Sequence, residues 1–308
     1  MFEEVFIEDT YNCRKGKGTL YGVKRLHQKI DEISEHYTKD CYIAKFDIKG
    51  FFMSIHKPTL WNMLKEFIED KYHKEDKELL LWLVEKVVKH CPEKNCIVKG
   101  NKKLWDNIDK DKSLFTNGDD YGLPIGNLTS QMFANFYLHK FDILMKDKFD
   151  GYGRYVDDFY IVDKDKSKIL SSVKKIERWM LDKLGIKLHE NKRYIQYYQK
   201  GCKFIGSVVK GCKLYVGNYT KSRFIDKVKF FNNRNNLEYI KNHFINFMSS
   251  INSYLGFMKH YLSYSIKRNI ICMICSEWWD VFYTKSDFSK IILKNKYKQL
   301  EYGKNIWT

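Results

Sequence analysis

The sequence of 308 residues has little proline and no flexible linker. Its only prolines are Pro58, Pro92 and Pro124, and neither a Gly/Ser-rich stretch nor an internal repeat interrupts it. Tethered domains are usually separated by such segments. We therefore expect any subdomains to be packed rather than tethered, in a chain long enough for one large or two modest domains.

Long apolar runs are missing as well. No stretch approaches the roughly 18 residues that a membrane-spanning helix needs, and Met1–Val5 carries acids where a signal peptide carries bases. The sequence predicts a cytoplasmic protein with no membrane among its partners. Its eight cysteines are scattered, and we expect them to be reduced because a chain of this length needs no disulfides.

Two pairs of these cysteines have spacings that bear on metal binding. Cys272 and Cys275 have the spacing of a zinc knuckle, but they lie in an apolar helical run with no second pair nearby. Cys91 and Cys96 flank a loop beside His90. We expect neither pair to bind a metal ion.

Acidic residues are too few to balance the bases. The chain has 55 Lys and Arg against 38 Asp and Glu, a formal net charge of +17, and 16% of its residues are aromatic. Cations neutralise phosphates and aromatic rings stack on bases, so this composition favours a nucleic acid as partner. The charge alone would also suit solubility or an acidic protein partner.

Among the acids that are present, Asp157 and Asp158 are the most informative. They lie between two short strand-like segments, Tyr152–Val156 and Phe159–Val162, so we expect them at the tip of a tight hairpin. Adjacent carboxylates repel each other unless a cation neutralises them, which favours a divalent metal ion. A solvated turn is the alternative, because Asp is common in turns.

Other segments supply a coarse secondary structure. Residues 41–48 alternate as a strand does, with Asp47 on the face opposite the apolar residues. The pattern is helical over residues 58–89, 129–146 and 169–184. Residues 91–120 are polar, which predicts an insert that lies outside the core sheet. Short strands are predicted at residues 186–188, 204–209 and 213–216, and from Ser222 the chain becomes helical and basic.

Three segments in this order carry a resemblance. They are Phe46–Phe52 (FDIKGFF), Gly122–Gln131 (GLPIGNLTSQ) and Tyr155–Asp158 (YVDD). The set resembles the palm motifs of reverse transcriptases, which are RNA-directed DNA polymerases. Leu184–Lys192 and Phe204–Gly206 resemble the motif after the second palm helix and the primer-grip hairpin, so the match covers about residues 9–216.

The resemblance implies an α+β fold with right-hand polymerase architecture. We expect partial helical fingers and an antiparallel-sheet palm in residues 1–216, with an insert over about residues 57–120, and a helical, basic, thumb-like region in residues 217–308. Similar enzymes carry a basic triphosphate-binding segment before the region that matches Asp9–Thr19, and only eight residues precede Asp9 here. The sequence would then be a fragment, the product of a miscalled start, one part of a split polypeptide or a decayed copy. If the segment is absent from the protein, Arg14 and Lys17 would have to substitute for it, with reduced nucleotide affinity.

The same resemblance implies two-metal nucleotidyl transfer. Asp47 and Asp157 would bridge two Mg²⁺ ions, for which Mn²⁺ could substitute, the Ile48 carbonyl would help to bind one of them, and Asp158 would be the more variable contributor. Nucleotide contacts are implied for Phe51, Phe52, Ile125, Gly126, Ser130, Gln131 and Lys192. Template or primer contacts are implied for Arg14, Lys17, Phe204, Gly206, Tyr254 and Arg268.

Two of these positions have specific expectations. The family places a bulky ring at the position of Phe52 that excludes a ribonucleotide by steric clash; the alternative is a core aromatic beside Phe51. Ile125 stands where many reverse transcriptases have a Gln that contacts the nascent base pair. A branched aliphatic cannot make that hydrogen bond, so copying would be less faithful, unless Ile125 only packs beneath the turn.

Some features resemble one clade, the diversity-generating retroelements of bacteria and phages. These are the Ser-Gln ending of Ile125–Gln131, the segment Asp9–Thr19 and Ile251–Gly256. The clade implies error-prone copying of adenines, an RNA template, a DNA or RNA primer, deoxynucleoside triphosphates and a small helical accessory protein. The alternatives are an antiphage-defence reverse transcriptase, a nucleotide cyclase, and a catalytically impaired fragment that binds nucleic acid.

Overall fold

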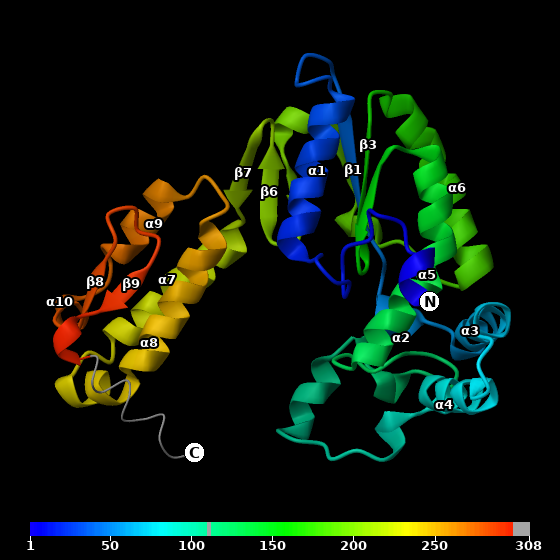
Figure 1. Cartoon of the computed structure of the whole chain (residues 1–308), viewed down its shortest axis with the longest axis horizontal. Helices are drawn as coiled ribbons and strands as arrows, with labels where there is room; N and C mark the ends of the chain where they lie inside the picture. Colours follow the sequence, from blue (N-terminus) through cyan, green and yellow to red (C-terminus); the bar gives the residue numbers. More distant parts are fainter. Residues whose placement is uncertain (110–111, 298–308) are drawn as a thin grey trace. The chain divides into compact units, whose positions relative to one another are not determined.

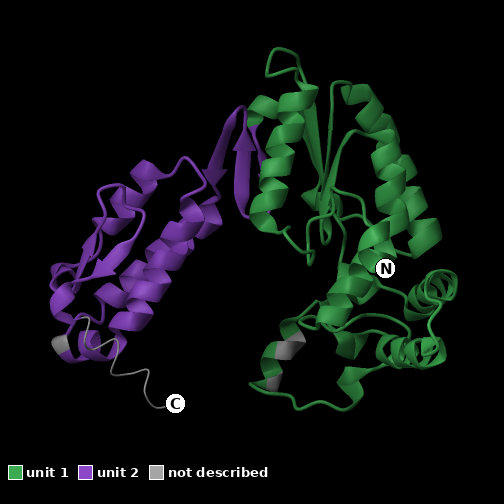
Figure 2. Ribbon diagram, viewed as in Figure 1, with its two compact units in different colours: residues 1–200 green, residues 201–308 purple. Residues whose placement is uncertain are grey.

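The computed structural model describes residues 1–109 and 112–297 (Figure 1). The chain divides into two compact units, Met1–Lys200 and Gly201–Thr308 (Figure 2). This division falls before the predicted boundary at residue 216. The strands between residues 201 and 216 belong to the second unit, where the Leu262 N–H donates to the Leu214 carbonyl over 2.9 Å. Two residues of the predicted insert, Lys110 and Asp111, lie outside the described residues.

A four-stranded antiparallel sheet forms the centre of the first unit. Its strands are β1 (Tyr42–Asp47), β2 (Gly151–Tyr155), β3 (Asp158–Asp163) and β4 (Tyr194–Tyr197), in the order β2-β3-β1-β4. The expected antiparallel sheet is thus confirmed. The strand predicted at residues 186–188 is wrong, because those apolar residues are buried by packing and contribute only one isolated bridge, Ile48 to Leu188.

Helices cover both faces of this sheet. The long helices α5 (Leu128–Lys148) and α6 (Lys166–Leu184) pack on one face, and α1 (Thr19–Ile33) lies on the other, where the space above Gly151 is closed by Ile33 (Figure 1). Side chains alternate between the two faces of a strand. The residues on the α5 and α6 face form the main apolar core, including Ala44, Phe46, Phe141, Met145, Phe159, Ile161, Ile176 and Met180.

The alternation decides where Asp47 lies. Ala44, Phe46 and Ile48 are buried in the core, whereas Asp47 lies on the opposite face, as the sequence predicted. Asp47 is paired in register with Asp158 across β1 and β3, so both carboxylates lie on the face of the sheet that α1 partly covers.

The rest of the first unit is helical. The run predicted over residues 58–89 is two helices, α3 (Lys57–Lys71) and α4 (Lys77–Lys89), and a short helix, α2 (Phe51–Ser54), follows β1. Single 3₁₀ turns lie at Phe2–Val5, Pro92–Lys94, Lys102–Asn107, Leu114–Thr116, Glu190–Lys192 and Tyr198–Lys200.

The second unit begins with a three-stranded antiparallel sheet, β5 (Cys202–Phe204), β6 (Ser207–Lys210) and β7 (Lys213–Val216). The single strand predicted over residues 204–209 is therefore two strands, separated by a turn. The helices α7 (Asn218–Asn232), α8 (Leu237–Met258), α9 (Tyr264–Ile271) and α10 (Ser276–Trp279) follow, as the helical pattern predicted.

The end of the second unit was not predicted. Strands β8 (Phe282–Thr284) and β9 (Ile291–Leu293) form a hairpin, and a 3₁₀ turn follows at Asn295–Tyr297. The core of this unit centres on Trp278, whose ring stacks on Phe247 with centroids 4.0 Å apart. No helix among the described residues is long and apolar enough to cross a membrane.

Candidate active site

The two adjacent acids lie at the tip of the β2–β3 hairpin, as predicted. Tyr155 and Asp158 are paired in register, so Val156 and Asp157 form a two-residue turn. Val156 has a φ of 57°, a left-handed conformation that is unfavourable for a β-branched residue. The turn is joined to β1 because the Ile48 N–H donates to the Asp157 carbonyl over 3.1 Å.

The hairpin brings three carboxylates together. Asp157 lies next to Asp158, and Asp158 lies opposite Asp47, where like charges repel. Burial, opposed in part by a backbone hydrogen bond, and the charges of Asp47 and Asp158 raise the pKa of Asp157 from 3.8 to about 6. Burial also raises the pKa of Asp158, although Lys45 opposes this shift. The site therefore favours an added positive charge.

Two lysines supply positive charge at these acids. The Lys192 Nζ lies 3.2 and 3.3 Å from the two carboxylate oxygens of Asp47, and the Lys45 Nζ lies 2.8 Å from Asp158 Oδ1. The Lys192 side chain is 56% exposed and that of Lys45 only 14%. Sequence reasoning missed Lys45, although its position two residues before Asp47 places both on one face of β1.

The donor atoms suit a divalent cation. Asp47 and Asp157 offer carboxylate oxygens, and the backbone of Ile48 lies between them. Among residues 1–109 and 112–297, no hydrogen bond to the Ile48 carbonyl is present. Oxygen-only ligand sets are those that Mg²⁺ and Mn²⁺ prefer, and the ammonium group of Lys192 shows that the cluster accepts a cation.

A cavity of about 390 Å³ adjoins the acids. Of the predicted site residues, it is lined by Asp47, Ile48, Phe51, Phe52, Ile125, Asp157 and Lys192. Phe51 is buried, Phe52 is partly buried, and their ring centroids are 5.7 Å apart. Ile125 is 74% exposed, so it does not pack beneath the turn. The cavity thus joins three distant segments of the predicted motif set.

Three other predicted nucleotide contacts are not among the residues that line this cavity. Gly126 is exposed and has a φ of 109°, a conformation that favours glycine. Ser130 is buried and lines a separate cavity of about 410 Å³ beside α4. The Gln131 side chain accepts a hydrogen bond from the Cys13 thiol over 2.5 Å.

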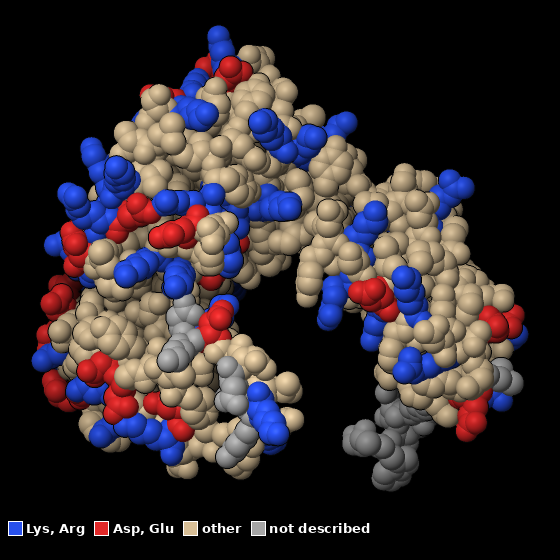
Figure 3. Space-filling view, turned by 180° about the vertical axis from the view of Figure 1, so that it is seen from behind, with Lys and Arg blue, Asp and Glu red and all other residues tan. Residues whose placement is uncertain are grey.

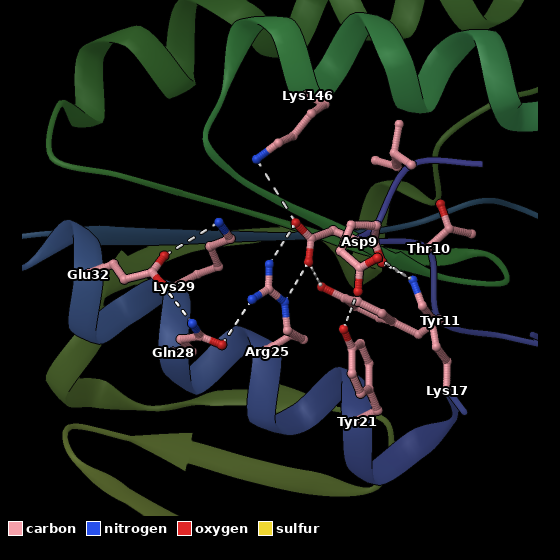
Figure 4. Close-up of polar contacts among 12 residues, drawn as sticks. Asp9, Thr10, Tyr11, Lys17, Tyr21, Arg25, Gln28, Lys29, Glu32 and Lys146 are labelled. Atoms are coloured by element: carbon pink, nitrogen blue, oxygen red, sulfur yellow. Dashed lines mark hydrogen bonds and ion pairs between the residues drawn. The ribbon is translucent and has the colours of Figure 1, made fainter. Parts of the chain in front are cut away.

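Arg14 and Lys17 are engaged within the N-terminal segment. The Arg14 guanidinium pairs with Glu3 over 2.7 Å and donates to the Thr10 carbonyl over 3.1 Å. Lys17 pairs with Glu8 over 3.1 Å (Figure 4). Their side chains are 8% and 10% exposed, so binding a triphosphate would require both to leave these partners.

The predicted template contacts of the second unit differ in exposure. Phe204 is buried, and Gly206 lies in the β5–β6 turn with a φ of 76°. The Tyr254 ring stacks on Phe224 with centroids 4.7 Å apart, whereas Arg268 is exposed on α9.

Sequence reasoning missed a row of cations and rings along α7. Tyr219, Arg223, Lys227 and Phe230 are spaced three or four residues apart, so they share one face of the helix, and Arg234 follows beyond its end. The Arg234 guanidinium lies 4.0 Å from the Phe230 ring centroid, and the Lys227 Nζ lies 5.0 Å from it. The helical spacing of these residues was the signal in the sequence. Figure 3 shows many further Lys and Arg side chains at the surface, with Asp and Glu side chains among them.

A second group of potential metal ligands lies away from the sheet. Ligand atoms of Cys91, Glu93 and Asp119 lie within 4.8 Å of one another. The Lys57 Nζ lies 3.3 Å from Cys91 Sγ, and Lys94 forms an ion pair with Asp119. Two of its three members thus already contact an ammonium group, whereas the buried Glu93 Oε2 has no hydrogen-bond partner among the described residues.

Comparison with known families identifies the class of protein. The family model for "Reverse transcriptase (RNA-dependent DNA polymerase)" matches residues 2–209, more than half of the chain. The chain therefore belongs to the reverse transcriptase family, and the resemblance of its palm motifs to those of reverse transcriptases is confirmed. No functionally curated protein matches it.

Solved structures of telomerases are similar to this chain, one of them with a TM-score above 0.5. Apo telomerase from Candida tropicalis is similar with a TM-score of 0.52 and 14% identity, over 86% of this chain and 47% of that one. Telomerase from Candida albicans in complex with a TWJ fragment of telomeric RNA matches with a TM-score of 0.44 and 15% identity, over 88% and 50% of the two chains. The chain spans about half the length of these structures. The α+β fold with antiparallel sheets is that of reverse transcriptases.

Proposed function

We propose that this protein is an RNA-directed DNA polymerase that extends a DNA or RNA primer on an RNA template. The observation that carries the proposal is the gathering of Asp47, Asp157 and Asp158, of which Asp47 and Asp157 line a cavity together with Phe52 and Ile125. Nucleotide addition needs carboxylates at the wall of a pocket that is large enough for a deoxynucleoside triphosphate, and this arrangement provides both.

The acids have different roles in this proposal. Asp47 and Asp157 line the cavity and, with the Ile48 carbonyl, would hold two Mg²⁺ ions, for which Mn²⁺ could substitute. When bound, such ions stabilise the attacking and leaving oxygens of phosphoryl transfer. Asp158 contributes less directly, because its carboxylate is paired with Lys45. Lys192 is exposed and adjoins Asp47, which suits a contact with the leaving pyrophosphate.

We assign polymerase roles to the two units. The sheet with α5 and α6 serves as the palm, the helices before and after β1 as partial fingers, and the helices of residues 217–308 as a thumb-like region. The α7 row of Tyr219, Arg223, Lys227 and Phe230 supports this role, because two cations flanked by exposed rings suit contacts with phosphates and sugars. Arg223→Gln should weaken binding of an RNA–DNA duplex and reduce its dependence on salt, as a titration at several salt concentrations would show.

The proposal is tested by primer extension. The purified protein, an RNA template, an annealed DNA primer, deoxynucleotides and Mg²⁺ should give a cDNA product, and Asp157→Asn should form it at least about 100-fold more slowly. A protein that cyclises ribonucleotides, or that binds the template without Mg²⁺-dependent extension, would contradict the assignment and favour a cyclase or a catalytically impaired nucleic-acid-binding protein respectively.

Phe52 supplies the sugar selection in this proposal. It is partly buried beside Phe51 and faces the same cavity as Asp157. A ring that fills the space of a 2′-hydroxyl rejects ribonucleotides by repulsion. Phe52→Ala should incorporate ribonucleotides more readily than the wild type, and Phe51→Leu provides a matched control. Unchanged sugar selection in Phe52→Ala would contradict the role of Phe52 in excluding ribonucleotides.

We further propose that the enzyme belongs to a diversity-generating retroelement and copies template adenines with errors. Ile125 supports this role, because it is exposed at the cavity and can offer no hydrogen bond to the nascent base pair. Ile125→Gln should lower misincorporation opposite adenine, and equal error rates in both proteins would reject the idea. A variable repeat and a small helical accessory gene beside the coding sequence would fit this role, and a defence island would fit antiphage use.

A further inference from the structure

The turn that carries Asp157 is held in an unfavourable conformation. Val156 has a φ of 57°, and a β-branched residue in this region costs about 1–2 kcal/mol. The conformation of Val156 sets the direction in which the chain enters Asp157. Without support the turn would relax, and the carboxylate of Asp157 would point elsewhere.

Two buried side chains hold both backbone polar groups of Val156. The Val156 N–H donates to Asn12 Oδ1 over 2.9 Å, and Arg154 Nη1 donates to the Val156 carbonyl over 2.8 Å. Asn12 is 2% exposed and Arg154 is fully buried. Val156 is half-buried. Losing either bond leaves a backbone group of Val156 without a protein partner, which costs up to about 1–3 kcal/mol where water cannot replace it. These contacts are therefore strong enough to offset the strain.

Arg154 is itself fixed by a complete set of partners. Its Nε and Nη2 donate to the two carboxylate oxygens of Asp142 over 2.7 and 2.6 Å, and the Tyr152 hydroxyl donates to the same carboxylate over 2.6 Å. A buried ion pair of this kind adds little stability compared with an apolar core of the same volume. Its use lies in fixing the orientation of the guanidinium group.

Asn12 is fixed by the chain on either side of it. The segment Asp9–Tyr11 runs beside β2: the Tyr11 N–H donates to the Arg154 carbonyl over 3.0 Å, and the Arg154 N–H donates to the Asp9 carbonyl over 2.9 Å. The Asn12 carbonyl accepts a hydrogen bond from Asn135 over 2.9 Å.

Asp9 anchors this segment to two helices. Its carboxylate accepts hydrogen bonds from Arg25 of α1 over 2.8 and 3.1 Å, and the Lys146 Nζ of α5 lies 4.0 Å away (Figure 4). The Tyr11 hydroxyl donates to the same carboxylate over 3.1 Å. The N-terminal segment is therefore attached to the scaffold on one side and to the turn on the other.

We propose that Asn12 and Arg154 are positioning residues that lock Val156 in its left-handed conformation and so direct the Asp157 carboxylate toward the metal ions. The activity readout rests on the proposed function, but metal binding does not require turnover. The proposal adds two residues outside the acid motifs to the machinery of the site.

The test is a titration with Mn²⁺ followed by electron paramagnetic resonance, on the full chain without nucleic acid. Asn12→Leu keeps a similar volume and removes the acceptor, and Arg154→Met removes the donors. Both should weaken Mn²⁺ binding by about tenfold or more, which is the size of effect that groups orienting metal ligands commonly have. Val156→Gly, which relieves the strain, should restore most of the affinity of Asn12→Leu.

Asn252 provides a matched control. Its side chain binds both backbone polar groups of Ile291, as Asn12 and Arg154 together do for Val156. The Asn252 amide donates to the Ile291 carbonyl over 3.0 Å and accepts from the Ile291 N–H over 2.8 Å. Asn252→Leu should lower the thermal midpoint as Asn12→Leu does, without changing Mn²⁺ affinity. Equal losses of affinity in both variants, or wild-type affinity in folded Asn12→Leu, would overturn the proposal.

A second variant, Asn12→Ser, tests the proposal if Asn12→Leu does not fold. Asn12→Ser withdraws the acceptor but leaves a polar cavity that water can fill, and it should show the same loss of Mn²⁺ affinity. The two proposals also fail separately. A wild-type protein that binds Mn²⁺ but extends no primer contradicts the polymerase function and leaves the positioning role intact, whereas a wild-type protein that binds no Mn²⁺ contradicts both.

Discussion

Two hairpin turns of this protein solve the same geometric problem in different ways. The β2–β3 turn and the β5–β6 turn both have two residues, and both begin with a β-branched residue in the left-handed region, Val156 with a φ of 57° and Ile205 with a φ of 47°. In the β5–β6 turn the next residue is Gly206, also at positive φ. In the β2–β3 turn the next residue is Asp157.

The difference lies in what stabilises each turn. Two consecutive residues at positive φ match the twist of a hairpin, and glycine adopts this conformation without strain. In the β5–β6 turn the partner is a backbone group, since the Gly217 N–H donates to the Gly206 carbonyl over 3.1 Å. A turn that must present a carboxylate cannot use glycine there. It relies instead on Asn12, from the N-terminal segment, and on Arg154, two residues before Val156 in β2.

Removing the acid of the first turn should have the largest effect. Asp157→Asn should reduce primer extension by about 100-fold or more, because it removes a charge on which transition-state stabilisation depends. Asp157→Asn should also weaken Mn²⁺ binding, whereas a polar substitution in the other turn, Ile205→Asn, should leave Mn²⁺ binding unchanged, because that turn carries no carboxylate. Comparable losses in both variants would show that the turns do not differ in function.

In the absence of metal ions, Asp157→Asn should be more stable than the wild type. Because the pKa of Asp157 is raised from 3.8 to about 6, the folded state binds a proton more tightly than the unfolded state. The free energy of unfolding therefore falls as pH rises from about 4 to 6 and stays lower above it. Asp157→Asn removes this cost and should be more stable than the wild type at pH 7.5 by about 1–3 kcal/mol. Urea unfolding in the presence of a chelator measures this difference in the free energy of unfolding. If Asp157→Asn is less stable than the wild type, burial of the Asp157 charge is not destabilising.

Glycine substitutions should separate the supports of the two turns. A Cβ at Gly153 would lie 2.3 Å from the Tyr11 hydroxyl and 2.5 Å from that of Tyr160, so Gly153→Ala should lower the free energy of unfolding by about 1–3 kcal/mol. It should also weaken Mn²⁺ binding by displacing the chain next to Asn12. At Gly206 the nearest such contact is 3.9 Å, so Gly206→Ala should cost only about 1 kcal/mol of backbone strain. Equal costs at both sites would contradict this difference.

A smaller effect is expected from Lys192. Burial and the neighbouring acids raise the pKa of Asp157, and the charge of Lys192 lowers it. Lys192→Met should therefore raise this pKa further, so that the acidic limb of the activity profile moves to higher pH. Lys45→Met should act mainly on Asp158, whose pKa Lys45 lowers. Superimposable pH profiles for Lys192→Met and the wild type would contradict this electrostatic account.

The smallest effect is expected at the second turn itself. Ile205→Asn should change the free energy of unfolding by less than about 1 kcal/mol, and toward greater stability, because Asn tolerates the left-handed conformation that the first position of such a turn requires. Thermal unfolding measures the change. A loss of several kcal/mol would show that the Ile205 side chain, rather than the backbone, stabilises the turn.

The sequence predicted the parts of the site that depend on local pattern. The alternation around Asp47, the hairpin at Asp157 and the helical basic segment after Ser222 all follow from periodicity, and the ordered motifs identified the family. β4 was not found, because the apolar residues at 186–188 gave a stronger strand pattern than Tyr194–Tyr197 did.

The supports of the turn could not be predicted from local pattern. Asn12 bonds to a residue 144 positions away, and a polar residue in a loop gives no periodic signal of its partner. The strand pattern around Arg154 predicts that the residue lies in a β-strand. It does not predict that Asp142, on a helix, is its partner. Such contacts are set by how the chain returns to the sheet, which only the three-dimensional structure shows.

The most direct test of the account is Mg²⁺-dependent primer extension on an RNA template by the wild type and by Asp157→Asn, with both proteins shown to be folded. We expect cDNA from the wild type and at least a 100-fold lower rate from the variant. Extension by Asp157→Asn at the wild-type rate, or a folded wild type that binds the template–primer duplex without extending it, would contradict the account.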